Sequence, residues 1–214
     1  MISVVVPTIT GREPYLAACM AAYEKTTDDY ELIVISGKPT CGEAWIAGAA
    51  DPIVERADYI HFSADDLLPH PGWADAAIEV CDRGFLPAPR ILNDDGTLQS
   101  CGGSDAWEVE KETGEQTDFS RIPFLSREQW QTIQGDVEPF LRGHHYYTDN
   151  AVSFAAAKHG IRTGVHRDYL FTHSLADPGR GAGMSWEERM WADFHKFCEW
   201  QSGLSHLSLT SSTS

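Results

Sequence analysis

The amino-acid sequence predicts an α/β fold, with a mostly parallel central sheet flanked by helices. A continuous apolar run at 2–6 is typical of a strand that is buried on both faces, and 31–35 and 59–62 are predicted as two further buried strands. Segments with helical periodicity separate these strands. Because strand and helix alternate over the first 90 residues, we expect right-handed crossovers between parallel strands.

Three helices are predicted in this first part of the chain. The first begins near Pro14, since proline suits the first turn of a helix, and extends to about Thr26. Its apolar residues recur at three- and four-residue steps, which gives the helix one buried side. A second helix is expected over residues 42–50, where alanine and glycine permit close packing, and a third from Pro71 to Cys81.

The later part of the chain is less regular. Residues 85–105 predict short strands around a turn at 93–96, whose Asp-Gly pair favours a hairpin. The polar stretch that follows contains one short helix, at 126–133. Two more helices, at 148–159 and 186–200, flank an extended segment at 162–172. We expect a single domain over 1–204, with halves 1–90 and 91–204, and a flexible tail at 205–214.

The composition excludes several classes of protein. The net charge is −16, from 32 acidic residues against 16 lysines and arginines, so phosphate backbones and anionic lipids would repel the surface. Five scattered cysteines without a C-x-x-C pair indicate neither a disulfide framework nor a zinc site. The chain begins with a strand, and no apolar stretch approaches the roughly 20 residues that span a bilayer. We therefore expect a cytoplasmic protein that binds neither membranes nor nucleic acids.

The most informative feature is a pair of adjacent acids, Asp65 and Asp66, just after the strand at 59–62. In open α/β sheets, ligands bind at the carboxyl ends of the strands. Two neighbouring carboxylates without a lysine or arginine beside them in the sequence repel each other unless a cation or a proton offsets the charge. A divalent cation shared with substrate phosphates fits this pattern. The alternative is that one of the acids caps the following turn.

These segments, in this order, resemble the family 2 nucleotide-sugar glycosyltransferases with the GT-A fold. The resemblance rests on the strand Ser3-Val4-Val5-Val6-Pro7-Thr8, the strand 31–35, the segment 58–66 that carries the acid pair, and Pro71-Gly72-Trp73. Further along, Tyr147-Thr148-Asp149-Asn150 and the strand that ends at His173 also match. The similarity covers residues 2–175 and is most specific in the first third.

The resemblance implies roles for four residues. Asp65 is expected to face the ribose or the metal, and Asp66 to bind Mg²⁺ or Mn²⁺ that bridges the two phosphates of the donor. His173 corresponds to a further metal ligand or diphosphate contact, although a capped histidine at a strand end is the structural alternative. Asp149 corresponds to the base that takes the proton from the acceptor hydroxyl. Capping of a helix N-terminus explains an aspartate there equally simply.

Other residues are assigned to the two substrates of such an enzyme. Pro7, Thr8 and the loop through Arg12 would line the nucleotide pocket, and Arg180 lies in a glycine-rich loop that could close over it. Flat rings that suit a sugar acceptor are those of Trp107, His144, His145, Tyr146 and Tyr147.

The chain departs from the family pattern at two positions. The family usually carries an acid at the end of the second strand to hold the nucleotide; this chain has Ser36 at that nucleotide-binding position, with Glu43 or Asp51 as possible substitutes. The acid pair also follows Ser63-Ala64 rather than another aspartate.

The sequence therefore predicts a metal-dependent, inverting glycosyltransferase. It would move a sugar from a nucleotide-diphosphate donor to an acceptor hydroxyl. Two alternatives remain open. A metal-dependent phosphohydrolase or nucleotidyltransferase would use the same acids and histidine, although the loop after the first strand has few of the glycines and basic residues of a nucleotidyltransferase. A non-catalytic carbohydrate-binding relic would keep the fold alone.

Overall fold

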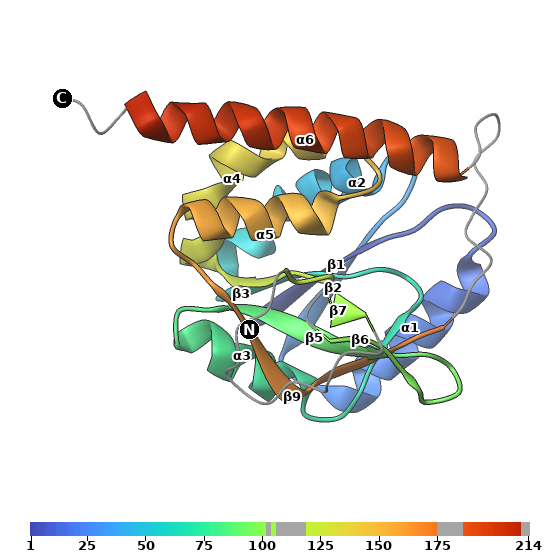
Figure 1. Cartoon of the computed structure of the whole chain (residues 1–214). Helices are drawn as coiled ribbons and strands as arrows, with labels where there is room; N and C mark the ends of the chain where they lie inside the picture. The colour runs from blue at the N-terminus through green and yellow to red at the C-terminus, as the bar shows by residue number, and fades with distance from the viewer. Residues whose placement is uncertain (102–103, 106–118, 175–185, 211–214) are drawn as a thin grey trace.

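The first of two sheets carries the predicted parallel core. The computed structural model describes residues 1–101, 104–105, 119–174 and 186–210 (Figure 1). In this sheet the strand order is β2 (Tyr30–Ile35), β1 (Ile2–Pro7), β3 (Tyr59–Phe62) and β8 (Phe124–Ser126). The first three strands are parallel and β8 is antiparallel to β3. The predicted α/β class, with a mostly parallel central sheet flanked by helices, is confirmed.

A second sheet lies beside the first. The strands at 85–105 and the extended segment at 162–172 were predicted, but their pairing into one sheet was not. Its order is β4 (Leu67–Pro69), β9 (Thr163–His173), β5 (Leu86–Leu92), β6 (Leu98–Cys101) and β7 (Ser104–Asp105). β9 is parallel to β5 and antiparallel to β4. No sequence pattern predicted β4, because a three-residue strand is too short to show periodicity. β5 and β6 form the expected hairpin around residues 93–96.

Helices cover both sides of the first sheet. α2 (Cys41–Ala49), α4 (Arg127–Leu141) and α5 (Thr148–Lys158) lie on one side beneath α6 (Trp186–Thr210), and α1 (Glu13–Thr26) and α3 (Trp73–Asp82) lie on the other (Figure 1). A short 3-10 helix, Val54–Arg56, precedes β3. The side chains of β1 alternate between the two cores: Val5 packs with the α2 and α4 side, and Val4 and Val6 with the α1 and α3 side. Burial on both faces explains the unbroken apolar run.

Three helices differ from their predicted bounds. α6 was expected to end at residue 200, but it continues to Thr210, into the segment 205–214 that was predicted to be a flexible tail. α4 was expected to end at residue 133, but it runs to Leu141 with Pro139 inside it. Its apolar positions continue at helical spacing beyond Ile133 and bury Val137 and Phe140, so packing holds the helix together past the proline. α3 begins at Trp73 rather than Pro71, because Gly72 occupies the N-cap with a φ of 88°.

Two glycines let α2 approach its neighbours closely. A Cβ at Gly48 would lie 2.3 Å from Cγ1 of Val5, so the helix can pack on β1 only without a side chain there. A Cβ at Gly42 would lie 2.2 Å from the carbonyl oxygen of Leu141, and the Gly42 N–H donates to the His144 carbonyl at 3.1 Å. The N-terminus of α2 is thereby held against the chain that leaves α4. The small residues expected to permit close packing therefore do so.

A polar chain runs through the core on the α1 and α3 side. His61 of β3 is fully buried among aromatic rings, and its Nε2 lies 3.0 Å from the Tyr23 hydroxyl oxygen. That hydroxyl donates to the Ser63 hydroxyl at 2.8 Å, two residues before Asp65. Burial lowers the pKa of His61 from 6.5 to about 3, so the imidazole is neutral in the folded protein.

The buried histidine predicts a loss of stability in mild acid. The unfolded chain protonates His61 near pH 6.5, whereas the folded protein does so only near pH 3, so its contribution is present above pH 6.5 and falls as the pH is lowered. Between pH 7 and pH 5 the loss from this residue should be about 2 kcal/mol. Urea unfolding at both pH values measures it, and His61→Gln should reduce the pH dependence by that amount.

The matched control is His195→Gln on the exposed side of α6. This variant should keep the pH dependence of the unmodified protein. An unchanged pH dependence in His61→Gln would contradict the assignment of a neutral buried imidazole.

Candidate functional site

Two adjoining cavities open at the carboxyl ends of the parallel strands. The first has a volume of about 300 Å³ and is lined by residues that follow β1, β2 and β3; we call it the Thr8 cavity. The second, of about 370 Å³, is lined by residues from both sheets and the start of α5; we call it the Asp149 cavity. The cavities share five lining residues, which are Cys41, Ala64, Asp66, His145 and Tyr146. Asp66 therefore stands where the two spaces meet.

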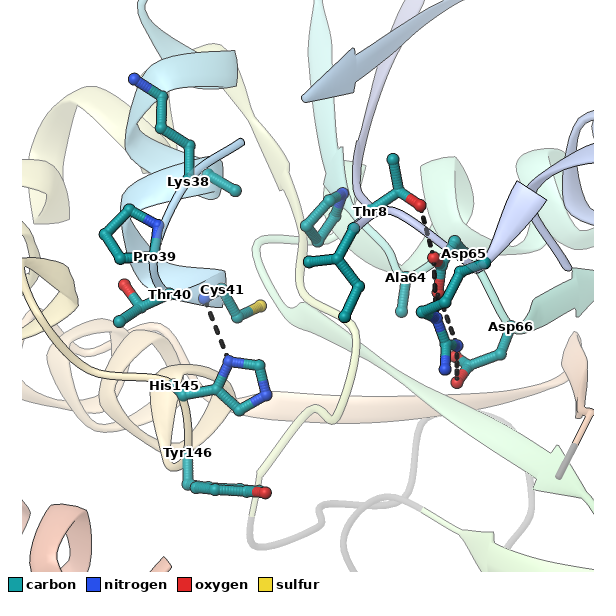
Figure 2. A pocket seen from close by; sticks show the side chains of 14 residues that line it. Thr8, Lys38, Pro39, Thr40, Cys41, Ala64, Asp65, Asp66, His145 and Tyr146 are labelled. Carbon is teal, nitrogen blue, oxygen red and sulfur yellow. Dashed lines mark hydrogen bonds and ion pairs between the residues drawn. The ribbon is translucent and has the colours of Figure 1, made fainter. Parts of the chain in front are cut away.

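The Thr8 cavity has two facing walls (Figure 2). Thr8 and the acids Asp65 and Asp66 form one wall, and the segment from Lys38 to Cys41 forms the other. Pro7 and Arg12 also line it, as predicted. Ser36 does not: it is exposed at the end of β2 and lines neither cavity. The chain reaches the cavity two residues later, at Lys38.

Arg12 is the cation that balances the acid pair. Its Nε lies 2.9 Å from both carboxylate oxygens of Asp65, and its Nη2 lies 2.7 Å from Oδ1 of Asp65 and from Oδ2 of Asp66. The Thr8 hydroxyl donates to Asp65 at 2.7 Å. The sequence shows no basic residue next to the pair, because the loop after β1 brings Arg12 there from 53 residues away. A guanidinium offers a planar fork that suits two carboxylates.

Asp66 also lies next to His173, the other residue that the resemblance assigned to the metal or the diphosphate. The second sheet brings the two together: Leu67 pairs with His173 in the ladder between β4 and β9, and the Ser174 N–H donates to the Asp66 carbonyl at 2.9 Å. His173 Nε2 lies 3.6 Å from Oδ2 of Asp66. Burial raises the pKa of the Asp66 carboxyl, but His173 and Arg12 together outweigh it and hold that pKa below its usual value.

The donor atoms fit a cation that substrate oxygens help to hold. Asp66 and His173 present one carboxylate oxygen and one imidazole nitrogen 3.6 Å apart, a separation close to that of two ligands on one ion. Within the described ranges, no group of three or more histidine, cysteine, aspartate or glutamate residues is arranged around one point. Both oxygens of Asp65 are engaged by Thr8 and Arg12. A divalent ion here would thus need phosphate oxygens and water for its remaining ligands.

Asp149 lies in the first turn of α5 and lines the second cavity. Burial raises the pKa of its carboxyl to about 6; the backbone N–H of Asn150 and the charge of Arg121 oppose that rise. A carboxylate with such a pKa accepts a proton readily near neutral pH. Tyr147, two residues before Asp149 and at the N-cap of α5, has a φ of 62°, the only positive φ outside glycine among the described residues. Backbone strain of this kind is common at functional sites.

The segment 145–146 forms a wall common to both cavities and is held by α6. The backbone N–H groups of His145 and Tyr146 donate to Oδ2 of Asp193, at 2.9 and 3.0 Å. His145 Nδ1 accepts from the Cys41 N–H at 3.3 Å (Figure 2). Burial raises the pKa of the Cys41 thiol to about 12, so this cysteine is neutral and unreactive. Sequence reasoning missed Asp193, because nothing in the pattern of α6 distinguishes it.

Of the other predicted residues, some line the two cavities and some do not. Tyr147 lines the Asp149 cavity, whereas His144 stacks on Phe140 and lines neither cavity. Trp107 and Arg180 lie outside the described residues. Arg121 and Gln99 line the Asp149 cavity without having been predicted, since they belong to segments with no motif.

Loss of Arg12 should destabilise the protein. In Arg12→Ala two neighbouring carboxylates, largely shielded from water, would remain without their cation, at a cost of about 3 kcal/mol. Urea unfolding at pH 7 measures the change. Arg56→Ala, at an exposed position in the 3-10 helix, is the control and should stay within about 0.5 kcal/mol of the unmodified protein. Equal stability of the two variants would contradict this account of the acid pair.

Comparison with known proteins places the fold but no family. No family model matches the chain, and no curated protein matches it. The structure is similar to that of A197 from STIV, with a TM-score of 0.50 and 15% identity over 78% of this chain and 82% of that one. It is also similar to S. aureus TarS, with a TM-score of 0.51 and 14% identity over 81% of this chain. This chain corresponds to 36% of TarS.

None of the helices in the described part is long and apolar enough to cross a membrane.

Proposed function

We propose that the protein is a glycosyltransferase that moves a sugar from a nucleotide-diphosphate donor to an acceptor hydroxyl with inversion. One observation carries the proposal. Two cavities of substrate size adjoin at Asp66, and the second contains a carboxyl whose pKa is raised to about 6. A transferase of this kind needs a donor pocket, an acceptor pocket and a base in the second.

The donor would lie in the Thr8 cavity with its diphosphate at the junction. Arg12 presents its guanidinium at this point and is already shared between two carboxylates, so it can turn toward a phosphate while remaining paired with Asp65. Asp66 and His173 would hold Mn²⁺ or Mg²⁺. When bound, the ion would neutralise the charge that develops on the departing diphosphate.

The acceptor would lie in the Asp149 cavity. As the acceptor oxygen forms a bond to the anomeric carbon of the sugar, its proton passes to the Asp149 carboxylate. The bond from the anomeric carbon to the diphosphate breaks, and its electron pair leaves with the nucleoside diphosphate. One displacement from the opposite face inverts the anomeric centre.

The fold is compatible with this proposal, since ligands of open α/β sheets bind at the carboxyl ends of the strands, where the two cavities lie. TarS is one of the solved structures whose fold is similar to that of this chain. At 14% identity the likeness concerns the fold alone, and the function is argued from the site.

The proposal predicts that a nucleotide sugar binds and that its binding is strengthened by a divalent metal ion. A nucleotide sugar that binds the folded protein should raise its melting temperature, more so with Mn²⁺ present. The measurement is a thermal-shift panel of nucleotide sugars and free nucleoside diphosphates, with and without Mn²⁺. Asp66→Ala should lose the effect of the ion, and Asp28→Ala, at an exposed site, should retain it. No response to any of these compounds would overturn the proposal and favour the hydrolase or carbohydrate-binding alternatives.

The role of Asp149 as the base predicts how kcat depends on pH. With the acceptor saturating, kcat should rise with pH through about 6, because the carboxylate form of Asp149 is the active one. Asp149→Asn should lower kcat by a factor of about 100 or more while donor binding, followed by thermal shift, is kept. A flat profile between pH 5 and 8, or an active Asp149→Asn variant, would remove Asp149 from the role of base.

A further inference from the structure

Arg121 is held rigidly at the edge of the Asp149 cavity. Both of its neighbours make buried hydrogen bonds: the Ser120 hydroxyl donates to the Pro87 carbonyl at 2.6 Å, and the Ile122 carbonyl accepts from the Tyr169 hydroxyl at 3.0 Å. The Ser120 N–H also donates to the Ser153 hydroxyl, on α5, at 2.9 Å. The backbone at Arg121 therefore has little freedom, and its side chain lines the cavity beside Asp149.

The guanidinium of Arg121 lacks an acceptor for one of its hydrogen-bond donors. Its Nε is shielded from solvent and has no hydrogen-bond partner among the described residues. Its Cζ lies over the Phe119 ring at 5.6 Å. A buried donor without an acceptor is costly, and such groups in folded proteins call for an explanation. Arg12, in the neighbouring cavity, has by contrast two carboxylates on its fork.

Asp149 does not provide the missing partner. No ion pair within 4.0 Å joins the two residues in the described part of the chain. The charge of Arg121 lowers the pKa of Asp149, but burial exceeds that effect and leaves the pKa near 6. The attraction is thus too weak to keep Asp149 in a paired, fully ionised state. Arg121 stays available to a group that enters the cavity.

We propose that Arg121 binds an anionic group, a carboxylate or a phosphate, on the substrate that occupies the Asp149 cavity. A planar fork with five donors matches such groups and gives little to a neutral sugar. The group has two possible sources: a uronic acid that is the transferred sugar, or an acidic acceptor. This inference rests on the proposed function in taking the cavity as the place where sugar and acceptor meet.

The first arm of the test compares donors that differ by one carboxylate. Isothermal titration with UDP-glucose and UDP-glucuronate should give at least about tenfold tighter binding of the glucuronate if the transferred sugar carries the charge. The second arm compares glucose with glucuronate and glucose 6-phosphate, with and without UDP. Preference for the two anionic sugars in this arm assigns the charge to the acceptor, and does not depend on recognition of any nucleotide.

Variants distinguish binding of the anionic group by Arg121 from attraction by the overall charge of the protein. Arg121→Gln should abolish the preference for the anionic partner, and Arg121→Lys should keep part of it because the charge remains. Arg162→Gln is the matched control, since Arg162 also lies over an aromatic ring, that of Phe85, but is exposed and lines neither cavity. This control should bind all probes as the unmodified protein does.

The outcomes distinguish this inference from the proposed function. Equal binding of anionic and neutral probes in both arms by the unmodified protein overturns the role of Arg121, even if Arg121→Gln fails to fold. Transfer from a donor without any such preference leaves the glycosyltransferase proposal in place. Arg121-dependent binding of the anionic sugars without a response to any nucleotide sugar overturns the glycosyltransferase proposal instead.

Discussion

The ion pair between Arg12 and Asp65 is the interaction on which the site depends. It joins the loop after β1 to the loop after β3, two segments that lie 53 residues apart in the chain. Without a cation at this point, two adjacent carboxylates would face each other at the end of a buried strand. The side chains of Arg12 and Asp65 are only 13% and 6% exposed, so water screens the pair little. The position of the acids, and the wall of the Thr8 cavity, follow from this contact.

The second sheet completes the site from the other side. The pairing of Leu67 with His173 sets the histidine next to Asp66, although 107 residues separate Asp66 from His173 in the sequence. The same sheet supplies Gln99, whose side-chain oxygen lies 3.1 Å from Nδ1 of His173 and orients the ring. The parallel strands of the first sheet thus provide the acids, and the mixed sheet provides the groups that face them.

Local patterns predicted the first third of the fold well. β1, β2 and β3 were predicted from short apolar-rich segments, and α1 from the spacing of its apolar side, because each signal lies within one element. β2 was expected to be buried, but it is an edge strand in which only Ile33 is buried. The strands β5 and β9 were also predicted, but β4 and the pairing of these strands into a second sheet were missed, since the pairing depends on contacts between distant segments. The length of α4 was underestimated for a different reason: Pro139 is a strong helix-breaking signal that tertiary packing overrides.

The candidate site was predicted in part. Six of the predicted residues line one or both of the two cavities, because they lie at strand ends or begin a helix at the edge where ligands bind. They are Thr8, Arg12, Asp65, Asp66, Asp149 and His173. The sequence did not indicate the pairing of Arg12 with the acids. Nor did it indicate Arg121 or Asp193. Arg121 stands out because its buried Nε has no hydrogen-bond partner among the described residues, and Asp193 because it accepts two hydrogen bonds from a distant segment.

The hold of α6 on the segment 145–146 has a consequence for how the chain divides into parts. Every strand of the two described sheets lies before residue 174, so the frame of the molecule is laid down without the last helix. The segment 145–146, which forms the wall common to both cavities, is however held by hydrogen bonds to Asp193 on that helix. Residues 1–174 therefore contain all the described strands, but the two cavities also depend on α6, because Asp193 holds one of their walls.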